Sequence, residues 1–338
     1  MEMLLAWLQF AVCLGAIALA GPVMTRSGQT IARLTGLSAS WVGLILLATA
    51  TSLPELFTGI SAVTIAGTPD IAMGDALGSC VFNLVMLAML DALSEDEPVW
   101  RRSDQGHILT AAFGIILIGF VGVLIQVTGS DKGLNFHYRH ISLYSPFLLV
   151  LYFVAMRAAY FYERRPREFA DRIPEVEETA TLPSAIARYL AAATVVAATG
   201  AYLPFVGLEV ADAMGWRTSF VGTLFIAAAT SVPELIVTIS ALRIGSIDMA
   251  VGNLLGSNLF AILVIAIDDF AYTDGPLFAQ VSPAHSITAF AASIMAALCI
   301  VGLLYRPGNR FFGRAGWIGL SLLAVYLLSS YSIYLHGH

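Results

Sequence analysis

Ten long apolar stretches, separated by short polar breaks or by breaks that contain glycine and proline, dominate this sequence. A helix needs about 20 apolar residues to cross the hydrocarbon core of a bilayer, because each residue adds about 1.5 Å. Backbone amides must also be paired within lipid, so the chain is predicted to be an all-α membrane protein. Its ten transmembrane helices are predicted at residues 3–24, 38–66, 70–92, 107–128, 143–162, 184–206, 215–243, 248–270, 285–305 and 312–335.

Composition agrees with a lipid environment. Hydrophobic residues make up 58% of the chain and charged residues only 12%, whereas a soluble protein of this size has about 25% charged residues. This balance excludes an ordinary cytosolic enzyme, a disordered chain and a nucleic-acid-binding protein. Cys13, Cys80 and Cys299 all lie in apolar stretches. We therefore predict neither a disulfide framework nor a metal cluster, and we expect the cysteines to be packing residues. No bound cofactor is expected.

The basic residues indicate orientation, because Lys and Arg in short loops stay on the cytoplasmic side of a membrane. With the N-terminus outside, only Lys132, Arg139 and Arg217 of the 17 basic residues lie outside. We predict a protein of a bacterial-type plasma membrane with both termini outside and a cytoplasmic linker at residues 163–183. The first stretch has the length of a signal peptide, but its start, Met-Glu-Met, has no basic residue, so we expect the helix to be retained.

Two segments of the chain repeat each other. The segment "SWVGLILLATATSLPELFTGISA" (40–62) aligns without a gap on "SFVGTLFIAAATSVPELIVTISA" (219–241), and slightly more than half of the positions are identical. Further along, "DIAMGDALGSCVFNL" from Asp70 aligns on "DMAVGNLLGSNLFAI" from Asp248. The repeated unit is therefore a pair of predicted helices.

The repeats divide the chain into two five-helix halves, 1–162 and 184–338. The helix pair occupies residues 38–92 in the first half and 215–270 in the second. Because five is an odd number, the second copy must enter the membrane upside down relative to the first. Inverted repeats are typical of secondary transporters, whose binding site lies at the midplane where the copies meet.

Each repeat contains the motif Thr-Ser-x-Pro-Glu-Leu near the middle of a predicted helix. An ionisable side chain at the bilayer centre costs at least about 2.5 to 3.5 kcal/mol, so two glutamates at equivalent positions indicate a function. The alternative is a protonated carboxyl group that hydrogen-bonds to a neighbouring helix. The proline cannot donate a hydrogen bond and opens the helix, which frees main-chain carbonyls. The motif residues are Thr51, Ser52, Pro54 and Glu55 in the first repeat and Thr230, Ser231, Pro233 and Glu234 in the second.

The second helix of each repeat carries a polar stripe. Gly-x-x-x-Gly spacings on the same helices predict close helix contacts, which would bring the stripes near the glutamates. Two alternatives stay open: Asn83 could form an interhelical hydrogen bond, and Asp75 could be hydrated near the end of its helix. The stripes are Asp75, Ser79 and Asn83 in the first repeat and Asn253, Ser257 and Ala261 in the second.

These side chains offer only hard oxygen ligands and amides, which suit calcium, sodium or protons, whereas zinc and copper prefer His or Cys. Two ionised glutamates that face each other carry a charge of about -2, which matches one divalent cation. After calcium has left, other cations must balance the two glutamates while the site reorients to face the other side of the membrane. Sodium ions or protons can do so, and this exchange is antiport.

At these residues the chain resembles the cation/calcium exchanger superfamily, whose best-known members are the sodium/calcium exchangers. The resemblance rests on both Thr-Ser-x-Pro-Glu motifs, on Gly-Ser-Cys-Val-Phe-Asn at 78–83 and on Gly-Ser-Asn-Leu-Phe at 256–260. It implies ten helices and exchange of calcium against sodium or protons by alternating access. By motif position it implies that Glu55 and Glu234 are central calcium ligands, together with the carbonyls of Thr51 and Thr230. The sodium sites implied on either side contain Ser52, Ser231, Ser79, Ser257, Asn83 and the carbonyls of Ala48 and Ala227.

Two positions depart from the family pattern. Ala261 stands where the second repeat of the family usually has Asp or Asn, and Asp75 replaces the usual Asn. Alanine offers no side-chain ligand, so the counter-ion stays open between sodium and protons. Asp75 is a candidate either to compensate for the lost ligand or to carry a proton.

The expected function is thus a calcium antiporter coupled to sodium, with proton-coupled exchange as the alternative. An intramembrane enzyme is disfavoured because His-Glu-x-x-His is absent and Asp75 follows Ala-Met-Gly rather than Gly-x-Gly. A passive cation channel is disfavoured by the inverted repeat. The expected partners are these ions and the lipid bilayer, and no obligate protein partner is evident in the sequence.

Overall fold

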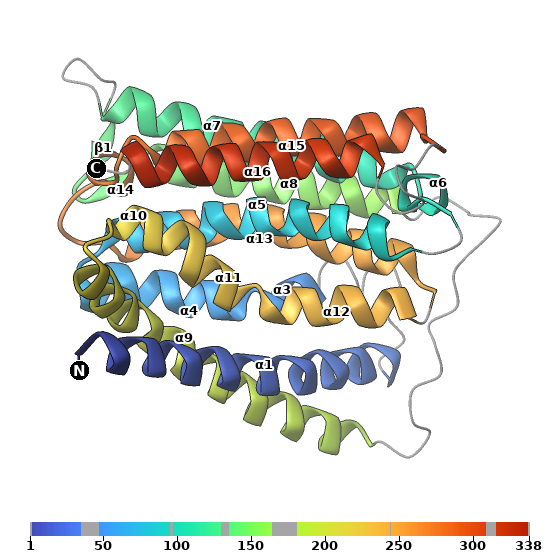
Figure 1. The fold of residues 1–338 in the computed structure, drawn as a ribbon, viewed down its shortest axis with the longest axis horizontal. Helices are drawn as coiled ribbons and strands as arrows, with labels where there is room; N and C mark the ends of the chain where they lie inside the picture. Colours follow the sequence, from blue (N-terminus) through green and yellow to red (C-terminus); the bar gives the residue numbers. More distant parts are fainter. Residues whose placement is uncertain are drawn as a thin grey trace.

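The computed structural model of the chain describes residues 2–34, 47–94, 97–129, 135–163, 181–243, 245–308 and 316–336. These residues are almost entirely helical and form one long bundle (Figure 1). The first half contains α1 (Glu2–Leu34), α3 (Ala48–Thr51), α4 (Leu53–Ser61), the π-helical turn η2 (Ala62–Ala66), α5 (Pro69–Leu93), α6 (Val99–Arg102), α7 (Gly106–Thr128), β1 (His137–Tyr138), β2 (Ile141–Ser142) and α8 (Tyr144–Glu163). The second half contains α9 (Leu182–Met214), α10 (Thr218–Val221), the π-helical turn η3 (Gly222–Ile226), α11 (Ala227–Thr230), α12 (Val232–Arg243), α13 (Ile247–Ala271), α14 (Leu277–Gln280), α15 (His285–Tyr305) and α16 (Trp317–His336).

The predicted fold class, an all-α membrane protein with two inverted five-helix repeats, is confirmed. Among the described residues, eight helices are long and apolar enough to cross a membrane, and the bent pair Thr218–Thr230 and Val232–Arg243 makes a ninth span. The remaining predicted span, 38–66, begins outside the described residues and continues as α3, α4 and η2. The β1 and β2 strands form a small antiparallel hairpin between α7 and α8.

Several helices extend beyond the predicted spans. The first continues through Pro22 to Leu34, and α9 continues from the predicted end at residue 206 to Met214. Gly215 then adopts a left-handed φ of 65°, which ends the helix. Hydropathy locates the part of a helix that suits lipid, whereas the helix itself ends where the backbone turns.

The inversion is visible in the direction of the helices. Both chain termini lie at one end of the bundle, which we call the termini end, and α8 finishes and α9 begins at the opposite end (Figure 1). Helix α5 starts at the termini end, whereas its repeat equivalent α13 finishes there (Figure 1). Most of the predicted linker, residues 164–180, lies outside the described residues, and the assignment of the termini end to the outside of the cell stays a prediction.

The second helices of the repeats form the centre of the bundle. Within their most apolar windows, 89% of the residues of α13 and 67% of those of α5 are buried, compared with 28% for α1 and for α16. Helices α5 and α13 contact each other and are surrounded by the other spans. The polar stripes that the sequence places on these two helices are therefore held away from lipid.

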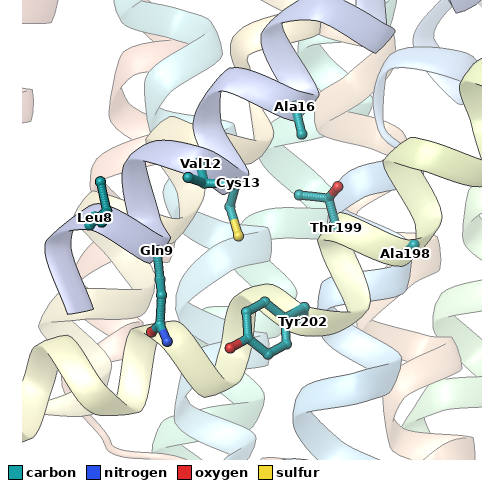
Figure 2. A pocket seen from close by; sticks show the side chains of 8 residues that line it. All are labelled: Leu8, Gln9, Val12, Cys13, Ala16, Ala198, Thr199 and Tyr202. Atoms are coloured by element: carbon teal, nitrogen blue, oxygen red, sulfur yellow. The ribbon is translucent and has the colours of Figure 1, made fainter. Parts of the chain in front are cut away.

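A cavity of about 400 Å³ opens between α1 and α9 (Figure 2). None of the motif residues lines it, so it is separate from the polar centre. Its lining consists of Leu8, Gln9, Val12, Cys13, Ala16, Ala198, Thr199 and Tyr202.

Candidate functional site

The first Thr-Ser-x-Pro-Glu motif breaks its helix. Helix α3 ends at Thr51, and Ser52 leaves the helical conformation with φ of -90° and ψ of 12°. Pro54 then lies in the first turn of α4, where its missing N–H leaves no internal hydrogen bond unmade. Glu55 follows in the same turn, at the positive end of the α4 dipole. The predicted opening of the helix by proline is thus an interruption of one residue, Ser52, whose amide still donates to the carbonyl of Ala48 at 3.0 Å.

The second motif breaks in the same way. Helix α11 ends at Thr230, Ser231 has φ of -82° and ψ of 8°, and Glu234 lies in the first turn of α12. The two parts of this span are bent by 44°. Each glutamate is therefore held at the start of a half-helix inside the protein.

Serines from the polar stripes contact the glutamate of the same repeat. Ser79 on α5 donates a hydrogen bond to Oε1 of Glu55 at 3.2 Å, and Ser257 on α13 donates to Oε1 of Glu234 at 3.3 Å. The prediction that close helix contacts bring the stripes to the glutamates is confirmed. The two contacts are equivalent under the inverted repeat.

The serines of the motifs reach across to the opposite repeat. Ser52 donates to Oε1 of Glu234 at 3.0 Å, and Ser231 lies 3.5 Å from Oε1 of Glu55. Ser231 also donates to Oγ of Ser79 at 3.2 Å. Both glutamates thus belong to one polar cluster. Because the helix is interrupted at Ser52, its hydroxyl reaches the glutamate of the other repeat rather than that of its own motif.

The threonines of the motifs make a second pair of crossed contacts. Thr230 donates to Oδ1 of Asp75 at 2.8 Å, and Thr51 donates to Oδ1 of Asn253 at 3.4 Å. Asp75 is only 1% exposed. The alternative in which this carboxyl group is hydrated at a helix end is therefore wrong.

Buried negative charge is the main electrostatic property of the cluster. Glu55 and Glu234 are 3% and 0% exposed, and Oε2 of each has no hydrogen-bond partner among the described residues. Asp75, which accepts a hydrogen bond from Thr230, likewise has no hydrogen-bond partner for its Oδ2 among the described residues. Helices α4, α5, α12 and α13 contain one basic residue in total, Arg243 at the end of α12. Ionised carboxylates at this depth need cations to balance them.

Main-chain carbonyls complete the oxygen-rich surroundings. Oxygen atoms of Ala48 and Ala227 each accept a hydrogen bond from the motif threonine of the same repeat, at 3.2 Å in both cases. No group of three or more His, Cys, Asp or Glu side chains suited to a metal occurs in the described part of the chain. An ion held here therefore needs hydroxyls and carbonyls in addition to the two glutamates.

Asn83 does not contact the glutamate cluster. Its Nδ2 donates to Oδ1 of Asn258 at 2.9 Å, and Asn258 in turn donates to the carbonyl of Cys80 at 3.3 Å. The alternative of an interhelical hydrogen bond is confirmed. Asn258 was not predicted as a site residue because it aligns with Cys80 in the first repeat. A search for polar residues at matching positions of both repeats does not find a position that is polar in only one of them.

The glycines of α5 explain how the repeats approach so closely. A Cβ atom on Gly78 would lie 2.3 Å from the carbonyl oxygen of Thr223, and one on Gly74 would lie 2.9 Å from the amide nitrogen of Thr223. Both glycines thus pack on the backbone of η3. The close helix contact predicted from the Gly-x-x-x-Gly spacing is confirmed on α5.

A histidine–aspartate pair holds the start of each central helix. His107 lies 3.0 Å from Oδ1 of Asp248, and His285 lies 3.0 Å from Oδ1 of Asp70. Both histidines fall outside the aligned repeats. The spacing from His107 to His285 nevertheless equals the spacing from Asp70 to Asp248, so the two pairs are equivalent under the repeat. The pairs tie the start of α13 to α7 and the start of α5 to α15.

The sequence matches the family described as "Sodium/calcium exchanger protein" over residues 5–161 and 185–335. Among relatives, it is 26% identical to the uncharacterized membrane protein MJ0091 of Methanocaldococcus jannaschii, with 90% of each chain covered. It is 27% identical to the inner membrane protein YrbG of Escherichia coli, with 78% of each chain covered. It is 25% identical to the sodium/calcium exchanger MaX1 of Methanosarcina acetivorans, over 89% of this chain and 91% of that protein.

Solved structures share the fold. The sodium-calcium exchanger NCX_Mj superposes with a TM-score of 0.63 at 21% identity, over 97% of this chain and 98% of that one. The structure of native YfkE superposes with a TM-score of 0.65 at 20% identity, over 96% and 92%. The described bundle is therefore an arrangement already known among solved membrane proteins.

Proposed function

We propose that this chain, which belongs to the sodium/calcium exchanger protein family and is therefore a multi-pass membrane transporter rather than an enzyme, moves calcium in exchange for sodium. The observation that carries the proposal is the pair of crossed contacts, Ser52 to Glu234 and Ser231 to Glu55. They join two buried carboxylates from inverted repeats in one cluster. Such a cluster offers a divalent cation two charges and several neutral oxygens.

We assign the ligands by their positions in the family motif, and the contacts around the two glutamates support this assignment. Glu55 and Glu234, with the carbonyls of Thr51 and Thr230, hold calcium. The flanking hydroxyls and carbonyls hold sodium after calcium leaves, and the charge of the site is balanced in both states. The flanking set is Ser52, Ser79, Ser231, Ser257, the carbonyls of Ala48 and Ala227, and Asn83, which reaches the set only if its contact with Asn258 rearranges.

Proton coupling is the second candidate, and Asp75 is the observation that favours it. The matching residue of the other repeat is Asn253, and both accept from a motif threonine. An aspartate at this position can take up a proton, whereas an asparagine cannot. Asp75 therefore adds a negative charge to the cation site when it is ionised and removes that charge when it is protonated.

Calcium flux in proteoliposomes distinguishes the two. The purified chain is reconstituted, and uptake of radioactive calcium is measured with an outward sodium gradient, with an outward proton gradient, with both and with neither. Uptake with the sodium gradient alone supports the proposal, and uptake with the proton gradient alone supports the second candidate. Calcium uptake in neither gradient contradicts calcium antiport altogether.

Restoring the missing ligand should strengthen sodium coupling. Ala261 is on the face of α13 that carries Ser257, one turn further along. In Ala261→Asp we expect the sodium concentration for half-maximal exchange to fall about tenfold, the effect of one added charged ligand. The matched control is Ala261→Val, which adds bulk without a ligand and should not lower that concentration. Equal sodium dependence in wild type and Ala261→Asp would mean that the position contributes no ligand.

A further inference from the structure

Asp268 is a buried carboxyl group for which the proposed ion site has no use. It is 1% exposed, and neither of its side-chain oxygens has a hydrogen-bond partner among the described residues. It rests on the bare backbone of α4, because a Cβ atom on Gly59 would lie 2.3 Å from Oδ2 and 2.7 Å from Oδ1.

The adjacent Asp269 shows what an ionised carboxylate requires at this place. It accepts hydrogen bonds from the amide nitrogens of Ser142 at 2.9 Å and Leu277 at 2.8 Å, and from the hydroxyl of Ser145 at 2.6 Å. Three donors stabilise a negative charge. Asp268 has no such donor, and an unpaired buried carboxylate is strongly unfavourable. The arrangement around Asp268 therefore suits the protonated form.

Packing alone does not require an acid at this position. The offset that aligns Asp70 with Asp248 places Leu90 at the position of Asp268, and Leu90 is equally buried. Thr238 stands at the position of Gly59 in the other motif. The glycine of the first repeat and the acid of the second thus meet on one side of the bundle only, because the equivalent positions on the other side are Thr238 and Leu90.

Asp268 lies between the glutamate cluster and the termini end. Helix α13 finishes at that end, and Asp268 is in its last turn (Figure 1). Eleven residues separate Asp268 from Ser257, which is three helical turns, so both lie on the same face. Gly59 follows Glu55 by one turn of α4. The carboxyl group therefore lies beside the face of α4 that carries Glu55, displaced toward the termini end.

We propose that Asp268 is a proton-binding site on the termini side of the ion site. The inference rests on the proposed function, because a transport cycle supplies the movement of α4 relative to α13. While α4 covers Asp268, the carboxyl group holds its proton. When water reaches the group, the O–H bond breaks, the proton passes to water at the termini end and the carboxylate remains; the reverse step restores the acid.

The surrounding groups do not offer a permanent counter-charge. The titratable or charged groups around this end of α13 are Glu55 on α4, Asp70 and Asp75 on α5, Asp269 on α13 itself, Tyr272 and Asp274 just after it, Tyr144 on α8, and Arg139 and His140 in the hairpin. Asp70 is paired with His285 at 3.0 Å, and Arg139 is exposed and lies over the ring of Tyr138, 5.9 Å from its centroid. His140 lies 3.3 Å from the carbonyl of Phe270. Arg157 is about 20 Å further along α8, by the rise of the helix. A proton is thus the cation that is available to Asp268 in this arrangement.

The test uses dicyclohexylcarbodiimide, which reacts with protonated carboxyl groups in apolar surroundings. The full chain in liposomes is treated at pH about 6 and about 9, on either side of neutrality, and labelled peptides are identified by mass spectrometry. We expect the adduct on Asp268 to exceed that on Asp269 at least about tenfold at the lower pH, the ratio that one unit of pKa gives. The adduct should disappear in Asp268→Asn. Equal labelling of both aspartates, or none on Asp268, overturns the proposal.

The pH dependence of calcium uptake provides a second readout. In the wild type, uptake should change with pH on the termini side, and Asp268→Asn should flatten that dependence while the protein keeps its thermal stability. An unchanged pH profile in this variant contradicts the role in transport. Labelling does not depend on calcium movement, so a wild type that takes up no calcium defeats the proposed function without altering the labelling result.

Discussion

Replacing Glu234 by Gln should abolish calcium uptake. The substitution keeps the size of the side chain and one oxygen that can accept from Ser52 and Ser257, but it removes one of the two charges that face the cation. Removing one partner of a buried charge pair costs about 3 to 5 kcal/mol. Calcium affinity should therefore fall about 100- to 5,000-fold, and Glu55→Gln should have the same effect.

The control for this experiment is Glu209→Gln. Glu209 is an exposed glutamate of the spanning helix α9, so the change removes the same charge away from the cluster. It should leave calcium uptake unchanged. Wild-type uptake in both Glu234→Gln and Glu55→Gln would contradict the assignment of the site.

Thermal unfolding in detergent separates loss of binding from loss of folding. Without calcium, Glu234→Gln should unfold at the wild-type temperature or above it, because the substitution removes an unpaired buried charge. Calcium should raise the unfolding temperature of the wild type, since a ligand that binds only the folded state stabilises it. The variant should lose this shift. A lower unfolding temperature without calcium would instead indicate a structural role for Glu234.

The helices and their inversion could be predicted because they depend on local properties. Long apolar runs identify the spans. The aligned motifs around Glu55 and Glu234 fall in the second span of each five-helix half, and because five is an odd number the second copy is inverted. The proline of each motif also predicts where the helix opens. These inferences need only the spacing of residues along the chain.

The contacts within the cluster could not be predicted in the same way. Ser52 bonds to Glu234 rather than to Glu55 because its helix stops at that residue and the other repeat packs against the break. Asn258 and Asp268 were missed because each has a different kind of residue at the matching position of the first repeat. A comparison of repeats finds the symmetric part of a site and overlooks the asymmetric part, where the two sides of a transporter can differ.

Replacing Gly78 by Ala should strongly impair both stability and transport. The added Cβ atom would lie 2.3 Å from the carbonyl oxygen of Thr223 and 2.7 Å from Cβ of Ala227. Backbone atoms cannot rotate away, so α5 must move off η3. Overpacking of this kind costs about 1 to 3 kcal/mol. It also displaces the neighbouring Ser79, which donates to Glu55.

Gly252→Ala is the matched control, because it makes the same change on the equivalent helix. Among the described residues, a Cβ atom on Gly252 would meet only Cε1 of His107, at an ordinary 3.5 Å. Alanine also favours a helix interior over glycine by up to about 1 kcal/mol. We therefore expect Gly252→Ala to match or exceed the wild type in thermal stability and to keep calcium uptake, while Gly78→Ala loses both. Similar behaviour of the two variants would show that the contact between α5 and η3 is not what holds the halves of the site together.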